Sequence, residues 1–311
     1  MNASGMLSTG TERNRRKMPL MKKAFGAFSL LAAAAMGQDL SGVIDLHAHC
    51  DPDTSARSID AIDLAKLARE RGMRAIVLKS HQDPTASLAY IVRKEVPGIE
   101  VFGGIALNRT VGGMNLAAVE HMAALKGGWG RIVWMPTADA ENQVRFYKQN
   151  RPFVSIARDG ALLPEVRAVV ASIARHKLVL ATGHSSPEED LLLVAEARRA
   201  GVQQVVVTHP MVPPVNMSIA QMKQAAAAGA YLEFTYLGLI PPVRSTIEDY
   251  AAAMRAVGVE HCVITSDLGR AGDPLHPDGL VLFIRALLKQ GFSQADIDRM
   301  AKTNPSRVLG L

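Results

Sequence analysis

The chain of 311 residues has little of what marks several protein classes. It contains only two cysteines, which excludes a disulfide-stapled scaffold and a four-cysteine zinc site. Aromatic residues make up only 5%, and no apolar run approaches the roughly 20 residues that cross a bilayer, so an integral membrane protein is not expected. The hydrophobic share of 48% is too high for a disordered chain. These limits predict a globular protein with a sizeable core.

Net positive charge is also small over most of the chain, although the whole chain carries +6. Residues 1–40 contain six lysines and arginines against two acidic residues, so they carry four of the six net charges. The rest of the chain is close to neutral. This distribution argues against a nucleic-acid partner.

The basic start of the chain has the pattern of a targeting segment. A basic region that ends at Lys23 is followed by a short apolar stretch and by small residues up to Gly37. This order predicts an N-terminal leader over residues 1–37, interpreted as a secretory signal peptide, with export or a periplasmic location. A short helical extension of a cytoplasmic protein is the alternative.

Eight compact β-branched runs along residues 38–311 predict buried parallel strands. They cover residues 43–46, 75–78, 101–105, 131–134, 178–181, 205–207, 231–234 and 262–265. Amphipathic segments lie between them, and several end at a glycine, as helices that lead into strands commonly do. Eight such units in one domain are typical of a (β/α)8 barrel. A doubly wound sheet is disfavoured because no glycine-rich nucleotide loop follows the first strand.

Two details complete the expected fold. The longest gap between strands contains residues 153–156 before Asp159-Gly160, which predicts a small β excursion. Cys50 follows the first strand and Cys262 begins the last one, so the two thiols should lie towards opposite ends of the barrel and stay unpaired.

Polar residues gather where the predicted strands end. These positions include five of the nine histidines, one lysine and one aspartate: His47, His49, Lys79, His81, His184, His209 and Asp267. In a barrel the carboxyl ends of all strands surround one cavity, so these side chains should converge. Imidazole nitrogens and a carboxylate oxygen are ligands of a catalytic zinc or a similar divalent ion.

Other polar residues fall on the neighbouring loops. Asn108, Arg109 and Arg270 follow strands three and eight, and they are candidates for binding an anionic part of a substrate. Structural roles in the loops are the alternative for these three residues. His276 follows strand eight and could reach a substrate, whereas His121, His176 and His261 are expected on the surface.

The His-x-His of strand one, the single histidines after strands five and six, and the aspartate after strand eight resemble the amidohydrolase superfamily. The last residues, Asn304-Pro305-Ser306-Arg307-Val308-Leu309, resemble its closing helix. The stretches at residues 103–109 and 134–137 are similar to a little-characterised amidohydrolase-related branch. The resemblance covers the chain from about Leu40 to Leu311.

The resemblance implies a metal-dependent hydrolase in which a metal-activated hydroxide attacks an amide, lactone or ester bond of a small molecule. An anionic substrate is compatible with it. It assigns His47, His49, His184 and Asp267 as metal ligands, with Asp267 also the general base. His209 would bind a second metal or donate a hydrogen bond to the substrate. One zinc ion is favoured and two remain an alternative. A homo-oligomer is also compatible with the resemblance.

One departure from the superfamily concerns the bridge between two metals. Strand four ends Trp134-Met135-Pro136-Thr137, which provides neither the lysine nor the glutamate that bridges the metals in many members. Lys79 and His81 after strand two are the nearest replacements and possible ligands. Lys79 could be carboxylated, could hold an anionic substrate group, or could pair with Glu233.

Other activities remain open from the sequence. The same ligands would support a non-hydrolytic decarboxylase or isomerase of this fold. A PHP-type phosphoesterase also begins with His-x-His, but its further histidine and glutamate ligands are not found here. A barrel that binds metal without catalysis is a further alternative. Loss of one of the histidines or of the aspartate would favour it, but all of the positions named above carry these residues.

Overall fold

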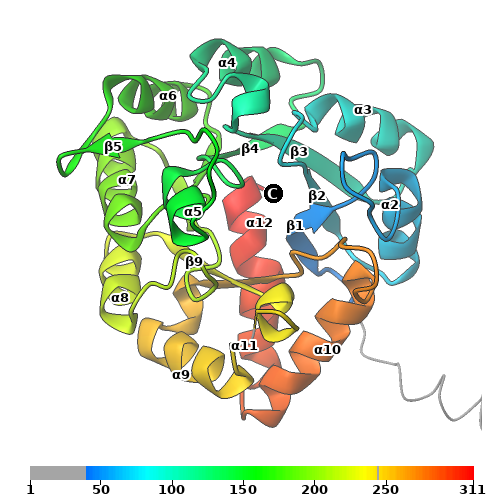
Figure 1. Cartoon of the computed structure of the whole chain (residues 1–311). Coiled ribbons are helices and arrows are strands. Elements are labelled where there is room, and N and C mark those ends of the chain that lie inside the picture. Colours follow the sequence, from blue (N-terminus) through cyan, green and yellow to red (C-terminus); the bar gives the residue numbers. More distant parts are fainter. Residues whose placement is uncertain (1–39, 244) are drawn as a thin grey trace, which may run out of the picture. The chain divides into compact units, whose positions relative to one another are not determined.

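The computed structural model describes residues 40–243 and 245–311, and these residues form a (β/α)8 barrel (Figure 1). The barrel strands are, in spatial order, β1 (Ile44–His49), β2 (Ala75–Lys79), β3 (Glu100–Ala106), β4 (Gly130–Trp134), β7 (Val179–Ala181), β8 (Gln204–Val207), β9 (Tyr231–Thr235) and β10 (Cys262–Thr265). All neighbours are parallel. The predicted fold and all eight predicted strands are confirmed. The leader predicted over residues 1–37 lies outside the described residues.

Helices surround the strands and follow them along the chain. They are α2 (Ala61–Glu70), α3 (Ala86–Glu95), α4 (Leu116–Ala124), α5 (Glu141–Phe146), α6 (Pro164–Arg175), α7 (Pro187–Ala200), α8 (Ile219–Ala227), α9 (Ile247–Val257), α10 (His276–Lys289), α11 (Gln294–Asp298) and α12 (Asn304–Leu309). Local sequence sets their ends. Ser186 and Ser218, for example, begin α7 and α8 with capping boxes.

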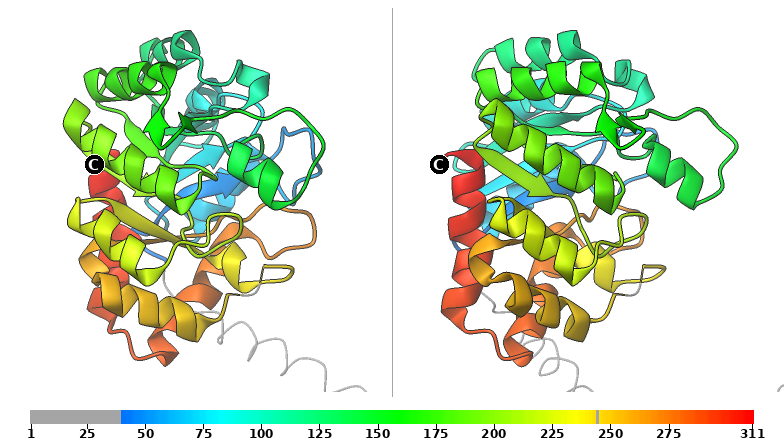
Figure 2. Two further views of the ribbon diagram at one scale, coloured as in Figure 1. Left: turned by 60° about the vertical axis from the view of Figure 1, so that its left-hand side comes forward. Right: turned by 90° about the vertical axis from the view of Figure 1, so that its left-hand side faces the viewer.

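Alternation along the strands divides the core into two layers. One set of side chains fills the barrel interior, including Ile44, Phe102 and Trp134, and α12 closes one end of this layer with Val308 and Leu309. The other set packs against the surrounding helices. Figure 2 shows α12 at one end of the barrel and α5 with its following loop at the other end. Because α12 covers the amino ends of the strands, their carboxyl ends, where the predicted site residues lie, are at the end that carries α5.

The barrel closes where β10 meets β1. The backbone N–H of His49 donates to Leu268 (2.9 Å), and that of Asp267 donates to His47 (2.8 Å). The buried carboxylate of Asp45 accepts from the backbone N–H groups of His47 and Ser266, at 3.1 and 3.0 Å. We call this contact between β1 and the end of β10 the seam.

The predicted β excursion is only partly correct. A hairpin of β5 (Ala157–Arg158) and β6 (Ala161–Leu162) forms around Asp159 and Gly160, whose φ values of 50° and 75° suit a tight hairpin turn. The expected strand at residues 153–156 is not part of it. Val154 instead exchanges backbone hydrogen bonds with Asp139 and Glu141 at the start of α5, which the sequence analysis did not predict.

Two further expectations concern cysteine and the membrane. Cys50 and Cys262 are both buried and free, as predicted. No helix in the described part of the chain is long and apolar enough to span a bilayer.

Candidate active site

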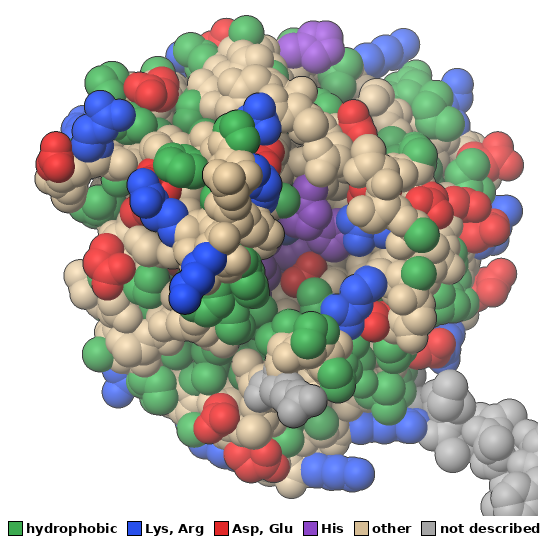
Figure 3. All heavy atoms as spheres, viewed as in Figure 1, with side chains coloured by type: hydrophobic (Ala, Val, Ile, Leu, Met, Phe, Trp, Pro, Cys, Tyr) green, Lys and Arg blue, Asp and Glu red, His purple; other side chains and the backbone are tan. Residues whose placement is uncertain are grey.

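Five histidines form a closed ring at the carboxyl ends of the strands. Adjacent ring centroids lie 5.2 Å apart for His47 and His49, 4.8 Å for His49 and His81, and 5.9 Å for His81 and His184. His209 completes the circle, 4.8 Å from His184 and 6.2 Å from His47. Histidine side chains are visible at the bottom of a hollow in this face of the molecule (Figure 3). The structure thus brings together the five histidines that the sequence placed at strand ends.

Three of the predicted ligands form a compact group with the geometry of a possible metal site. One ligand atom from each of His47, His49 and Asp267 lies within 4.8 Å of the others, and all three residues are buried. The Asp267 Oδ1 atom is 2.8 Å from His47 Nε2 and 3.4 Å from His49 Nε2. Asp267 has a φ of 52°, a left-handed conformation that is uncommon outside glycine. The chain therefore holds this carboxylate in an unusual backbone conformation. His184, the fourth predicted ligand, belongs to the histidine ring but not to this compact group.

Glu233 is a site residue that the sequence analysis did not assign. It lies in β9, is 2% exposed, and its Oε1 atom is 3.1 Å from His47 Nδ1. Thr265 Oγ1 donates to the same oxygen at 3.0 Å, and the backbone N–H of His209 donates to Oε2 at 3.3 Å. The carboxylate thus fixes the orientation of His47 and leaves Nε2 of that ring facing Asp267. The only sign of this role in the sequence is that Glu233 is an isolated acidic residue inside an apolar strand.

Lys79 occupies the interior side of the histidine ring. Its Nζ atom is 2.7 Å from His47 Nε2 and 5.2 Å from the centre of the Trp134 ring, and the residue is 1% exposed. Burial lowers the pKa of Lys79 to about 8, although the negative charges of Asp267 and Glu233 oppose this shift. The positive charge of Lys79 disfavours the charged form of His47, because two adjacent positive charges repel each other.

The histidines divide into one charged ring and four neutral ones. Burial alone would disfavour the charged form of His47, but the carboxylates of Asp267 and Glu233 outweigh it and raise the pKa to about 9. Burial lowers the pKa of His49 to about 3 and that of His209 to about 4. It also lowers the pKa of His81 and His184 well below the usual value. Neutral imidazoles keep a nitrogen lone pair for a metal or a substrate.

Asp267 stays ionised in this environment. Burial would raise its pKa, but the positive charge of His47 and the hydrogen bonds from His47 and His49 hold the pKa of this carboxyl well below its usual range. The side chain is only 7% exposed and lines the cavity above the ring. It is therefore an anionic proton acceptor in contact with both the histidines and the open cavity.

The predicted substrate-binding residues fall in different places. Asn108 is buried and braces the loops: its amide donates to Thr137 Oγ1 (2.7 Å) and to the His81 carbonyl (2.8 Å). Arg109 lines a separate hollow beside the chain that leads to α6. His276 is buried in the first turn of α10. Of the four, only Arg270 is among the residues that line the cavity above the histidines.

That cavity has a volume of about 370 Å³ and reaches four of the five histidines. Residues outside the sequence-based assignments also line it, including Arg57 after β1 and Gln143 and Tyr147 at α5. Gln143 Oε1 is 3.1 Å from His184 Nδ1, so α5 orients one histidine of the ring. The short helix that the sequence did not reveal is therefore a wall of the site.

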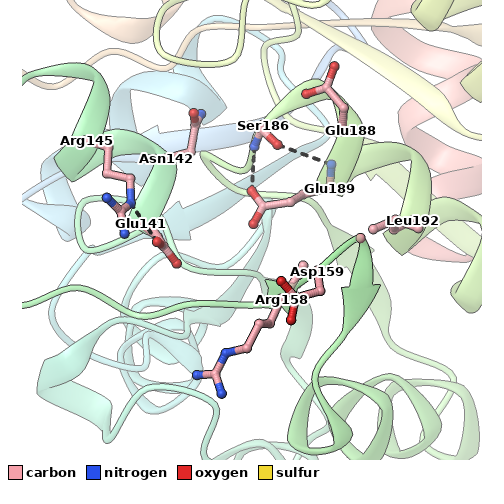
Figure 4. A pocket seen from close by; sticks show the side chains of 11 residues that line it. Glu141, Asn142, Arg145, Arg158, Asp159, Ser186, Glu188, Glu189 and Leu192 are labelled. Atoms are coloured by element: carbon pink, nitrogen blue, oxygen red, sulfur yellow. Dashed lines mark hydrogen bonds and ion pairs between the residues drawn. The ribbon is translucent and has the colours of Figure 1, made fainter.

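A second hollow of about 350 Å³ lies beside α5, the β5–β6 hairpin and the start of α7 (Figure 4). Several of its charged groups already have partners. Arg145 pairs with Glu141 at 2.6 Å, and Glu189 belongs to the capping box of Ser186. It contains no histidine. The histidine cavity is accordingly the candidate active site.

Comparisons with known proteins agree with this architecture. The model of DUF6282, a family of unknown function, matches residues 42–233. No curated protein matches the sequence significantly. Among solved structures, the probable dipeptidase PvdM from Pseudomonas aeruginosa has 13% identity and a TM-score of 0.63, covering 92% of this chain and 98% of that one.

Two further structures are similar over comparable lengths. An amidohydrolase from Burkholderia multivorans with bound zinc has 14% identity and a TM-score of 0.58, covering 86% of this chain and 99% of that one. The 2,6-dihydroxybenzoate decarboxylase from Rhizobium has 11% identity and a TM-score of 0.55, covering 87% of this chain and 99% of that one. These likenesses confirm the resemblance to amidohydrolases at the level of the fold.

Proposed function

Because the chain belongs to DUF6282, a family of unknown function, its activity has to be argued from its site, and we propose that it is a metal-dependent hydrolase of an amide, lactone or ester bond. The observation that carries the proposal is the compact group of His47, His49 and Asp267 inside a ring of neutral histidines. Two imidazole nitrogens and a carboxylate oxygen in one buried group form a suitable donor set for zinc.

The surrounding residues also fit a bound metal. Glu233 holds the Nδ1 side of His47, so Nε2, which faces Asp267 and Lys79, would become a ligand by giving up its proton. This matches the common carboxylate–histidine–zinc arrangement. His47, His49 and Asp267 would hold the ion, His209 and His81 are next to them in the ring, and His184 lies between those two. A divalent ion bound there would supply Lewis acidity and activate a water molecule near neutral pH.

The protein residues would then manage the proton and the developing charge. Asp267, ionised and facing the cavity, accepts a proton from the attacking water and later returns it to the leaving group. His209 or Lys79 stabilises the negative charge that develops on the substrate oxygen. His209 lines the cavity, whereas Lys79 is buried behind the ring, so we assign this role to His209 first.

Metal content and turnover test the proposal together. Purified protein, reconstituted with zinc if necessary, should hold one or two equivalents of divalent metal. His49→Ala should lose this metal, while His121→Ala, which changes an exposed histidine on α4, should keep it. A screen of aryl esters, lactones and N-acyl amino acids should then find turnover that depends on the metal.

Two outcomes would contradict the proposal in different ways. Protein that holds no metal after reconstitution removes the basis for a metal-dependent enzyme. Release of carbon dioxide from aryl carboxylates, without hydrolysis of any ester, lactone or amide, would instead assign the same residues to a decarboxylase.

A further inference from the structure

We propose that the substrate carries a single carboxylate group next to an apolar body, and that Arg57 and Arg270 bind this carboxylate. The inference deepens the proposed function and rests on the histidine cavity being its active site. It starts from the two cationic residues that line the cavity, one on the loop after β1 and the other on the loop after β10.

The backbone places these two arginines side by side. Arg57 and Arg270 form an isolated antiparallel bridge, and the neighbouring N–H of Ser58 donates to the carbonyl of Gly269 at 2.9 Å. Residues directly opposite each other in an antiparallel pair project their side chains to the same side. Two guanidinium groups therefore stand together at one wall of the cavity.

An aspartate holds one edge of each guanidinium group in place. Arg57 donates from Nε and Nη2 to Asp53 at 3.0 and 2.7 Å. Arg270 donates from Nε and Nη2 to Asp273, both at 2.9 Å. Among the described residues, neither Nη1 atom has a hydrogen-bond partner. Both arginines thus keep donors for a ligand while their own conformations are already fixed, which lowers the entropy lost on binding.

The charge balance favours a monoanion. The guanidinium of each arginine is matched by one aspartate carboxylate, so the two pairs together contribute little net charge. Planar guanidinium groups bind both carboxylates and phosphates. A singly charged carboxylate suits two partly neutralised arginines better than a doubly charged phosphate monoester does.

The remaining wall of the cavity selects an apolar body. Val212 and Pro213 from the loop after β8, Leu237 after β9, and Tyr147 after α5 line it. Figure 3 shows hydrophobic surface directly beside the hollow that contains the histidines. At about 370 Å³ the cavity lies near the lower end of the roughly 300–1,000 Å³ range of small-molecule sites. The substrate should accordingly be a compact carboxylate with an aliphatic or aromatic body.

Calorimetric binding to zinc-loaded protein tests this inference with simple probes. Benzoate should bind at least tenfold more tightly than benzamide, which lacks the charge, than acetate, which lacks the body, and than phenyl phosphate. The double variant Asp273→Asn/Arg270→Met keeps the local charge and should remove most of the preference for benzoate over benzamide. Glu141→Gln/Arg145→Met, the same paired change in the neighbouring hollow, should leave it unchanged.

Arg57 needs a paired change because Asp53 would otherwise remain without its partner. The double variant Asp53→Asn/Arg57→Met keeps the local charge and should also lose the preference for benzoate. Zinc content is measured on every variant, so a loss of metal is seen separately from a loss of carboxylate binding.

The outcomes separate the two proposals. Lost benzoate preference at unchanged zinc content supports the arginine pair. Unchanged benzoate binding in both folded variants overturns it, as does tighter binding of phenyl phosphate to the wild-type protein. If the wild-type protein takes up no zinc, the hydrolase proposal fails, and the same comparison of arginine variants on zinc-free protein still decides this inference.

Discussion

In the proposed metal site, Glu233 would act through His47 rather than by touching the metal. It accepts from the Nδ1 side of that ring and receives two further hydrogen bonds that fix its own position. Replacing it by glutamine keeps the shape but removes the charge that makes His47 a strong ligand. We expect Glu233→Gln to weaken zinc affinity about 10- to 100-fold, measured by competition with a chromogenic chelator.

The matched control for this prediction is Glu70→Gln, which makes the same change at an exposed position of α2. Its zinc affinity should equal that of the wild-type protein. Equal affinity in Glu233→Gln as well would show that the contact with His47 does not tune the metal.

Asp190 is a buried carboxyl group outside the cavity. It is 0% exposed near the start of α7, and the Thr182 hydroxyl is the one neighbouring group that favours its charged form. Burial raises its pKa well above the usual value, so the folded protein holds a proton that the unfolded chain releases near pH 4. Above that pH, folding stability falls by about 1.4 kcal/mol per pH unit until the folded-state pKa is reached.

The variant Asp190→Asn carries no ionisable group and should lose this pH dependence. Its stability relative to the wild-type protein should rise between pH 4.5 and pH 7.5 in urea unfolding experiments. Asp63→Asn, at a side chain that is 60% exposed, should show no such trend. A constant difference between Asp190→Asn and wild type across this range would mean that the carboxyl is ionised in both states.

At the scale of elements, the sequence predicts the strands and the residues at their ends. Each strand is a short apolar run buried on both faces, and the alternation of side chains places His47 and His49 in one site. Single histidines after β7 and β8 follow from the same rule. The strand pattern was therefore sufficient for the histidine ring and for Asp267.

The parts that the sequence did not reveal depend on contacts between distant segments. The helix α5 has only six residues and no side-chain cap, so it is too short to show a helical hydrophobic period in the sequence. Backbone hydrogen bonds with Val154 hold its start. Glu233 looks like a chance polar residue inside β9 until β1 brings His47 next to it. Arg57 lies in a loop, and only its bridge to Arg270 places it at the cavity.

The turn after β7 shows how closely one element is fitted to another. Gly183 has a φ of 70°, and a Cβ atom there would lie 2.4 Å from the Met135 carbonyl oxygen and 2.5 Å from that of Pro136. Gly201, at the end of α7, has a similar φ of 84° but nothing within 4 Å. The two glycines share the same backbone requirement and differ in their surroundings.

Alanine at the two positions should separate strain from steric conflict. We expect Gly201→Ala to cost about 1–2 kcal/mol from the positive φ alone. Gly183→Ala should cost about 2–5 kcal/mol, because the conflict with backbone atoms adds to this strain. Chemical denaturation measures both values. Equal losses would show that the loop after β4 moves aside without cost.

At the scale of the whole molecule, the candidate metal site lies on the seam that closes the barrel. His47 and His49 belong to β1, whereas Asp267 directly follows β10, so a bound ion would link the first and the last strand. Apart from the contacts of Asp267 with His47 and His49, this junction depends on a few backbone bonds and on the buried carboxylate of Asp45. Metal binding should therefore stabilise the closure of the barrel in addition to enabling chemistry.

This argument predicts both a size and a location for the effect of zinc. At a free zinc concentration 100 times the Kd, the native state gains about 2.7 kcal/mol, which corresponds to a rise in Tm of roughly 5–10 °C. Hydrogen exchange should slow most in β1 and β10, and least in β4 and β7 on the opposite side of the sheet order. His49→Ala should show neither effect. Protection spread evenly over all eight strands would place the stabilisation elsewhere than at the seam.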